Sequence, residues 1–168
     1  MRRRAPTTST GTAARYRARI FDDKRHDPYQ PAGKYAEPTR CRDCGAIYRK
    51  GRWQWGEAPE GARVDACPAC RRTQDRLAAG TLVLEGAFLA AHRAELLRLI
   101  HNEAEHERRE HPLHRIMHID EPGDRVEVST TDIHLPQRIG EALKRAYDGA
   151  LDVQYGHDEY RVRVRWQR

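Results

Sequence analysis

The segments Cys41-Arg-Asp-Cys44-Gly45 and Cys67-Pro-Ala-Cys70 contain all four cysteines of the chain and decide the fold of its first half. Thiolates bind zinc in a tetrahedron, and a CxxC pair turns tightly enough for both sulfurs to reach one ion. Gly45 directly follows the first pair and can adopt the positive φ that such a turn often requires. The spacing therefore predicts one structural Zn²⁺ ion, bound by Cys41, Cys44, Cys67 and Cys70.

Disulfide bonds and redox catalysis are the two rival interpretations of this cysteine pattern. Two disulfides suit a secreted chain, but the start Met1-Arg2-Arg3-Arg4 has no apolar stretch behind it, so we expect no secretory signal. A thioredoxin-like motif uses a single CxxC pair and would leave the second pair without a role. Because four thiolates would fill every coordination position, we expect the zinc to be structural rather than catalytic.

The twenty-two residues between the two pairs suit a β-hairpin, with Lys50-Gly51 as its turn. Trp53 and Trp55 alternate, so we expect them to share a face and cover the metal. Pro68 suits the first turn of a helix that residues 71–77 continue. A ribbon followed by a ligand-bearing helix is the treble-clef arrangement. The site would carry a charge of −2, and the arginines expected to offset it are Arg40, Arg42, Arg71 and Arg72.

The rest of the chain has the pattern of an α+β fold. Apolar residues recur at helical spacing over residues 86–110, and Pro112 ends that run. Two short alternating stretches then flank Pro122-Gly123-Asp124, which predicts a hairpin. We expect a helix from an N-cap at Thr131 or Asp132 to Asp148. Strands over residues 151–155 and 160–166 complete a predicted antiparallel sheet with helices on one face.

The excess positive charge of the chain lies in its first part. Residues 1–40 contain ten Lys and Arg against four Asp and Glu, which accounts for the whole net charge of +6. This part has few large aliphatic side chains, so we expect a disordered basic arm that either attracts phosphate or only aids solubility. The predicted divisions are a disordered arm over 1–39, a zinc ribbon over 40–80, a connecting helix over 81–112 and a small α+β domain over 113–168.

The last predicted strand has arginines on one side and apolar residues on the other. Arg161, Arg163 and Arg165 would stand about 6–7 Å apart, close to the spacing of backbone phosphates. An edge strand protected from aggregation by its charges is the alternative. The basic turn around Lys50 favours the same phosphate-bearing partner. The residues predicted to contact nucleic acid are Arg49, Lys50, Arg52, Arg161, Arg163 and Arg165.

The chain has no sequence signature of an enzyme. It contains no P-loop, no GxGxxG, no GxSxG and no cysteine beyond the zinc set, so we expect no catalysis and no small-molecule substrate. His101, His106, His111, His114 and His118 lack a strict ligand spacing, and a solvated helix end explains them more simply. No apolar run approaches the roughly 18 residues that cross a bilayer, so we expect a cytoplasmic protein without a membrane partner.

The cysteine segments, together with Trp53-x-Trp55, resemble the amino-terminal zinc region of the eukaryotic and archaeal large-ribosomal-subunit nuclear-export adaptor family. Residues 40–168 are more closely similar to short bacterial zinc-ribbon proteins related to that region, especially at 130–135 (TTDIHL), 142–147 (ALKRAY) and 161–166 (RVRVRW). The resemblance implies a treble clef packed near a ferredoxin-like domain, and contact with ribosomes or ribosomal RNA. The adaptor family usually has eight such cysteines where this sequence has one set of four, and the later domains and export signals of the eukaryotic adaptor are not found here. The resemblance therefore implies ribosome binding but not nuclear export.

These observations together predict a non-catalytic zinc protein that binds RNA and associates with the ribosome. The first alternative is a protein–protein adaptor whose ribbon docks a partner through Tyr48, Trp53 or Trp55. The second is a DNA-binding regulator, which ranks lower because the sequence has no recognisable helix-turn-helix.

Overall fold

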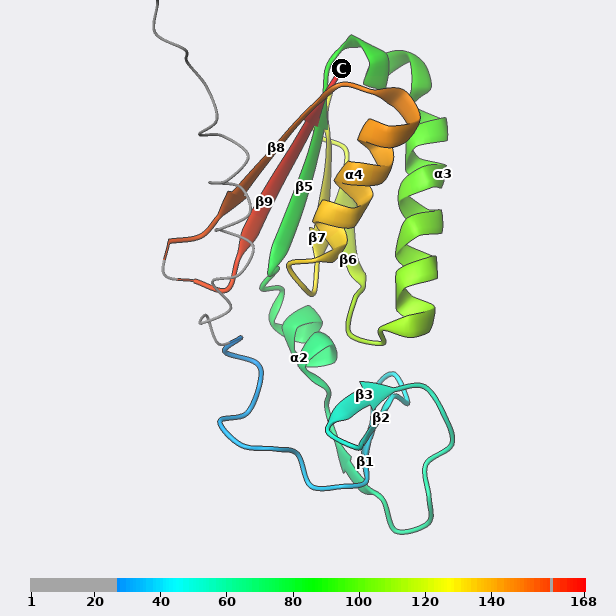
Figure 1. Ribbon diagram of the computed structural model, residues 1–168, viewed down its shortest axis with the longest axis vertical. Helices are drawn as coiled ribbons and strands as arrows, with labels where there is room; N and C mark the ends of the chain where they lie inside the picture. Colours follow the sequence, from blue (N-terminus) through cyan, green and yellow to red (C-terminus); the bar gives the residue numbers. More distant parts are fainter. Residues whose placement is uncertain (1–26, 158) are drawn as a thin grey trace, which may run out of the picture.

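The structure is a computed structural model, and it describes residues 27–157 and 159–168. A small β ribbon lies below a larger α+β unit, and the short helix α2 (Pro68–Asp75) leads from one to the other (Figure 1). The ribbon has the strand order β3-β2-β1-β4, in which only β4 runs parallel to its neighbour. Its strands are β1 (Thr39–Cys41), β2 (Ile47–Arg49), β3 (Arg52–Gln54) and β4 (Arg63–Asp65).

The larger unit is a five-stranded sheet with the order β6-β7-β5-β9-β8, covered on one face by two helices (Figure 1). Its strands are β5 (Gly80–Glu85), β6 (Ile116–Asp120), β7 (Val126–Thr130), β8 (Ala150–Tyr155) and β9 (Val162–Gln167). The helices are α3 (Ala87–Glu110) and α4 (Leu135–Tyr147). The predicted α+β class, the helix over 86–110, the hairpin at 122–124, the helix before Asp148 and the two last strands are confirmed. The predicted N-cap at Thr131 or Asp132 is wrong, because α4 is capped by His134.

The prediction of an antiparallel, ferredoxin-like sheet is wrong in one respect, because the sheet is mixed. Strand β5, which the sequence analysis did not predict, occupies the centre and pairs with β7 antiparallel and with β9 in parallel. The β8–β9 hairpin inserts β9 between β5 and β8. Leu82 and Leu84 alternate with less buried residues along β5, so the period-two pattern is present in the sequence.

The core of the larger unit lies between the sheet and the two helices. Val162, Val164 and Trp166 of β9 are fully buried there, while Arg163 and Arg165 are exposed on the opposite face of the sheet. Leu89, Leu96 and Ile100 of α3 join the same cluster, so residues 81–112 share their core with residues 113–168. Burial of each large apolar side chain contributes about 1.5–3 kcal/mol, so this helix stabilises the sheet rather than merely connecting two parts.

The predicted disordered arm covers two different situations. Residues 1–26 lie outside the described residues, whereas residues 27–38 pack against the ribbon and Thr39 already belongs to β1. The Tyr35 ring lies 5.1 Å from the rings of both Tyr48 and Trp53. The prediction is therefore wrong for residues 27–39, because an aromatic cluster compensates for the shortage of aliphatic residues in that stretch.

The first residues of this packed stretch contact Arg72 of α2, whose charged side chain is buried. Its guanidinium forms an ion pair with Asp27 and lies over the Tyr29 ring.

Among the described residues, no helix has the length and apolar character that crossing a membrane requires.

Candidate metal centre

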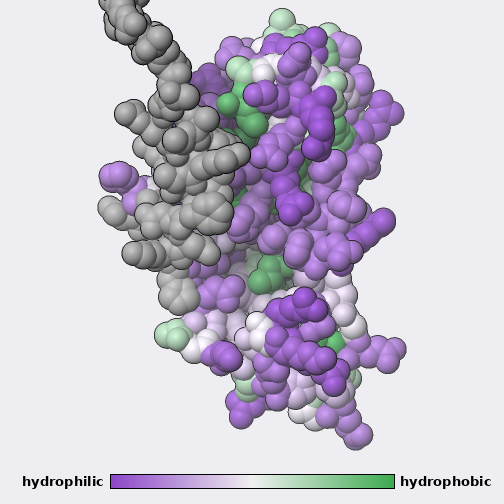
Figure 2. Space-filling view, in the orientation of Figure 1, coloured by the Kyte–Doolittle hydropathy of each residue, from purple (hydrophilic) through white to green (hydrophobic). Residues whose placement is uncertain are grey.

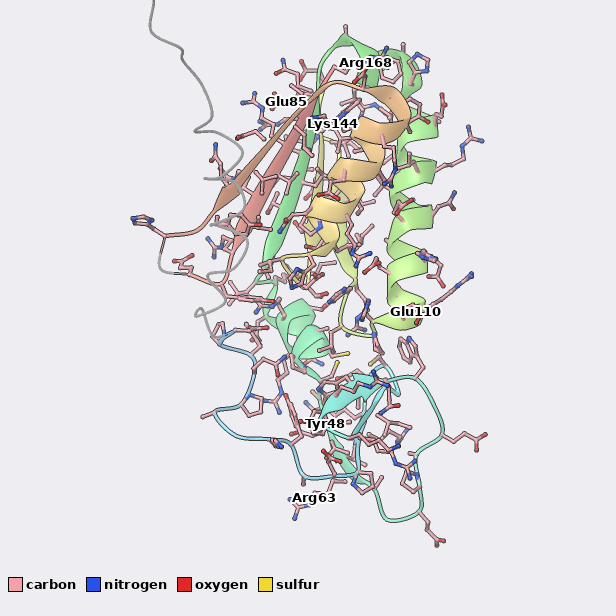
Figure 3. The ribbon with its side chains drawn as sticks, viewed as in Figure 1. Tyr48, Arg63, Glu85, Glu110, Lys144 and Arg168 are labelled. Atoms are coloured by element: carbon pink, nitrogen blue, oxygen red, sulfur yellow. The ribbon has the colours of Figure 1, made fainter. Side chains whose placement is uncertain are left out.

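The four cysteines come from two turns that the local sequence shapes. The first turn follows β1, and Gly45 within it has a φ of 77°, as the sequence analysis expected. The second turn follows β4, where Cys67 is the N-cap of α2 and Pro68 starts the helix. The fixed φ of proline suits that first helical position, where its missing N–H costs no hydrogen bond. Both turns therefore present their sulfurs to one point between the ribbon and α2, where sulfur atoms gather in Figure 3.

The distances among the four sulfurs fit a single tetrahedral metal ion. All four Sγ atoms lie within 4.8 Å of one another, and Cys44 Sγ lies 3.8 Å from Cys67 Sγ. A Zn–S bond of about 2.3 Å gives sulfur separations of about 3.8 Å at the corners of a tetrahedron. All four cysteines are free thiols rather than disulfide partners. Cys41, Cys44, Cys67 and Cys70 thus form a possible metal site, as the sequence predicted.

Backbone N–H groups donate to two of these sulfurs. Cys67 N lies 3.3 Å from Cys41 Sγ, and Cys70 N lies 3.4 Å from Cys67 Sγ. The second of these bonds also caps α2, whose first N–H groups have no partner within the helix. Such donors stabilise negative charge on sulfur, so the backbone is already arranged for thiolate ligands.

Arg115 supplies the positive charge closest to the sulfurs, a role that the sequence analysis missed. Its guanidinium NH2 group donates to Cys67 Sγ at 3.4 Å and to Cys70 Sγ at 3.3 Å. Arg115 precedes β6, so the larger unit contributes directly to a site in the ribbon. No sequence signal marks it, because the contact spans 45 residues from Cys70.

The arginines that were expected to offset the site charge have other carboxylate partners. Arg71 pairs with Asp65 at 2.8 Å, and Arg42 lies 3.9 Å from Asp43. Arg72, as described above, pairs with Asp27. Arg71 also interacts electrostatically with Cys67, so it contributes to the charge balance as expected, although its direct partner is a carboxylate.

The protonation of the thiols depends on their mutual contacts. The hydrogen bond with Cys67 lowers the pKa of Cys44 to about 4, and the same bond raises the pKa of Cys67. Burial raises the pKa of the Cys70 thiol to about 11. Without metal, the hydrogen-bonded pair of Cys44 and Cys67 therefore favours holding one proton between them, and burial favours the protonated form of Cys70. A metal ion must displace those protons when it binds.

An aromatic cluster packs beside the sulfurs. Tyr48 and Trp53 are buried in the same cluster as Cys41, Cys67 and Cys70, and Tyr35 and Leu113 pack against it. Trp55 was expected to cover the metal site together with Trp53, but it is not part of this cluster. Strand β3 ends at Gln54, so Trp55 lies beyond the strand. Its indole Nε1 instead donates to the backbone oxygen of Arg108 at 2.6 Å, at the end of α3.

The predicted nucleic-acid contacts fall into two separate groups. Arg49, Lys50 and Arg52 surround the tip of the β2–β3 hairpin, and all three are exposed. Arg49 and Arg52 are directly opposite each other, and neither they nor Lys50 form an ion pair within the described part of the chain. Like charges placed opposite each other on neighbouring strands destabilise a hairpin unless an anion lies between them.

The second group, on the face of the larger sheet opposite the helices, is more neutralised than the sequence suggested. Arg161 pairs with Glu159 at 3.3 Å, and Arg165 forms an ion pair with Glu85. Arg165 also lies opposite Asp152 of β8. The structure thus does not join the two basic groups into one surface, since one lies on the ribbon and the other on the sheet.

Comparison with models of protein families, with curated proteins and with solved structures found no match for this chain. The resemblance to the export-adaptor zinc region therefore stays a prediction, and the site must be interpreted from its own geometry.

Proposed function

We propose that this chain is a non-catalytic zinc-binding protein of the cytoplasm that binds RNA, in association with the ribosome. The proposal depends most on the cluster of four sulfurs, whose spacing fits Zn²⁺, and on the basic hairpin that lies on the same small ribbon. Zinc would hold a ribbon that has only a small apolar core of its own, and the ribbon would present its cations to phosphate.

The zinc site supports a treble-clef assignment as the finer description of the ribbon. The first pair of ligands precedes the β2–β3 hairpin, and the second pair begins α2. All four ligand positions would be occupied by cysteine, which leaves no open position for a substrate or a reactive water. This arrangement supports a structural rather than a catalytic ion.

The hairpin is the better candidate for phosphate contact than β9. Its turn is formed by Lys50 and Gly51, with φ of 53° and 76°, and Glu37 accepts hydrogen bonds from both backbone N–H groups at 2.8 Å. The turn is therefore held in place while the cationic side chains extend into solvent. The ribbon is also predominantly hydrophilic on the face visible in Figure 2. Unpaired cations on a rigid turn favour phosphate binding more than arginines already bound to carboxylates.

The adaptor alternative has less support. Tyr48 and Trp53 are 7% and 8% exposed, so the rings that would dock a partner are already packed inside the ribbon. Trp55 is 36% exposed, but its indole N–H is bonded to α3. Interface anchors are usually large side chains that become buried only in the complex.

The experiment that tests RNA binding is a salt titration of the full chain with single-stranded RNA. A triple variant Arg49→Ala, Lys50→Ala, Arg52→Ala is compared with Arg161→Ala, Arg163→Ala, Arg165→Ala, which removes the same number of charges. The slope of log K against log salt is negative, and each lost phosphate contact makes it about 0.7 less steep. The hairpin variant, which loses three cations, should therefore flatten the slope by about 2. We expect a smaller change for the strand variant.

Zinc content is measured for each variant so that unfolding is not mistaken for a lost contact. If the strand variant flattened the salt dependence as much as the hairpin variant or more, the phosphate contacts would be assigned to β9 instead. Absence of salt-dependent RNA binding by the unaltered protein would refute the proposal. Sedimentation of lysate with and without nuclease then tests association with the ribosome. A protein that binds ribosomal RNA should sediment with ribosomes only without nuclease, whereas a protein–protein adaptor would keep its partners after nuclease treatment.

A further inference from the structure

A second group of metal-ligand side chains, separate from the four cysteines, lies at the end of α3. Glu107 and His111 are one helical turn apart, and His114 follows in the next loop. One ligand atom from each of the three residues lies within 4.8 Å of the others. The end of α3, marked by Glu110 in Figure 3, points towards the ribbon, where Tyr48 is labelled.

Glu107 and His114 are already at the separation that a shared metal ion requires. Glu107 Oε2 lies 3.2 Å from His114 Nδ1. Bonds of about 2.0–2.1 Å to zinc place neighbouring ligand atoms about 3.4 Å apart in a tetrahedron. His111 is exposed, so its ring can rotate to complete the set without disturbing the core. The three side chains therefore need only a small adjustment to bind one ion.

The surroundings of these ligands resemble the outer shell of a metal site. The other ring nitrogen of His114, Nε2, lies 3.8 Å from Asp132 Oδ2. A histidine that binds a metal through one nitrogen commonly donates its other N–H to a carboxylate, which fixes the ring. Glu107 Oε1 is held at 2.7 Å by Arg138, which leaves Oε2 free to face the ion. Arg138 therefore orients Glu107, whereas the Asp132 carboxylate lies beyond hydrogen-bond distance of His114 and accepts instead from His134 N and Leu135 N.

The burial and charge of this group favour a cation. Glu107 is 4% exposed and Asp132 is 5% exposed, and Arg138, which remains partly in solvent, pairs with Glu107. Asp132 Oδ1 is buried without a hydrogen-bond partner in the described residues. Buried carboxylates are costly unless they are paired or coordinate a metal. A divalent ion at Glu107 would offset the negative charge that Arg138 leaves unbalanced.

A cavity of about 270 Å³ lies between the loop that follows α3 and the ribbon, and the two histidines of the group reach it. His111 and His114 line it from one side, and Tyr48, Arg52 and Trp53 line it from the other. Three protein ligands and a free position facing a cavity distinguish this group from the closed site of four cysteines.

We propose that Glu107, His111 and His114 bind a second divalent transition-metal ion, with Zn²⁺ or Co²⁺ as its fitting occupants and a fourth position open to the cavity. Two imidazoles and one carboxylate suit these borderline ions better than Mg²⁺ or Ca²⁺, which prefer oxygen ligands. Its ligands come from α3 and the loop that follows it, whereas the four cysteines come from the ribbon and α2.

The test is a titration of the reduced, metal-free full chain with Co²⁺, followed by measurement of bound Zn²⁺ after exchange. Cobalt in the cysteine site shows sulfur-to-metal charge transfer, whereas cobalt at the second site lacks it because no sulfur takes part. We expect a first equivalent with charge transfer and a second, weaker equivalent without it. His111→Ala should weaken the second equivalent at least about tenfold and leave the first unchanged.

His101→Ala is the matched control, because His101 is also exposed on α3 but is not part of the group. It should bind both equivalents as the unaltered protein does. Glu107→Gln provides a second variant, and a circular dichroism spectrum shows whether this buried substitution has changed the fold. Binding of only one equivalent by the unaltered chain, or an unchanged second equivalent in His111→Ala, would overturn the proposal.

Discussion

Arg115 offers the sharpest test of how the larger unit stabilises the metal centre. Its guanidinium donates to two of the four sulfurs, at 3.4 Å and 3.3 Å. Replacement by alanine would remove both bonds and the positive charge closest to a site that carries −2 when zinc is bound. The bonds are stronger in the loaded site, where sulfur holds more negative charge, so the loss should appear as weaker zinc binding.

The size of the effect follows from the single donor group involved. A hydrogen bond to a charged group contributes about 1.5–3 kcal/mol, which corresponds to roughly 10- to 100-fold in affinity. Loss of an outer-shell partner typically weakens metal binding by a similar factor. We therefore expect Arg115→Ala to bind zinc about 10- to 100-fold more weakly, and Arg115→Lys to lose less because it keeps the charge.

Competition with a chromophoric chelator, at constant pH and under reducing conditions, measures this affinity. Arg125→Ala is the matched control, since Arg125 is an exposed arginine just before β7 and its replacement removes the same charge from the far end of the β6–β7 hairpin. If Arg115→Ala bound zinc within about twofold of the unaltered protein, the reasoning on charge compensation would be refuted.

Three further predictions follow from the same contacts. When metal is absent, the pair of Cys44 and Cys67 holds one proton and Cys70, whose pKa is raised, holds another, so zinc binding releases at least two protons. Affinity should therefore fall about 100-fold for each unit by which pH is lowered, in a chelator competition between about pH 6 and about pH 8. Zinc removal should abolish amide protection in the ribbon but leave the five-stranded sheet protected in hydrogen exchange, because the two have separate cores. Leu82→Ala in β5 should lower the free energy of unfolding by about 2–5 kcal/mol, whereas Leu77→Ala, which is 52% exposed, should change it by less than about 0.5 kcal/mol in urea titrations.

Much of the metal centre could be predicted from sequence because its determinants are local. Two CxxC pairs, Gly45 and Pro68 each set the shape of a short turn, and such turns depend on their own residues. The amphipathic pattern of α4 is local in the same way, but its N-cap is His134 rather than Thr131 or Asp132. Asp132, two residues earlier, accepts hydrogen bonds from His134 N at 2.7 Å and Leu135 N at 3.0 Å.

The features that sequence did not reveal depend on contacts between distant segments. Arg115 reaches sulfurs across 45 and 48 residues, and nothing in its neighbourhood distinguishes it from other arginines. The parallel pairing of β5 with β9 joins Leu82 to Val164, also far apart in the chain. Tyr35 likewise packs on Trp53 although its own stretch is poor in aliphatic residues. Tertiary packing determines all three contacts, and local sequence patterns do not predict contacts between distant segments.

The central claim is that four thiolates share one zinc ion, and X-ray absorption at the zinc edge tests it most directly. The reduced full chain is loaded with one equivalent of zinc, so that the metal occupies its tightest site. The account predicts four sulfur neighbours at about 2.3 Å. A spectrum dominated by nitrogen or oxygen at about 2.0 Å, or failure of the protein to retain the ion, would contradict it.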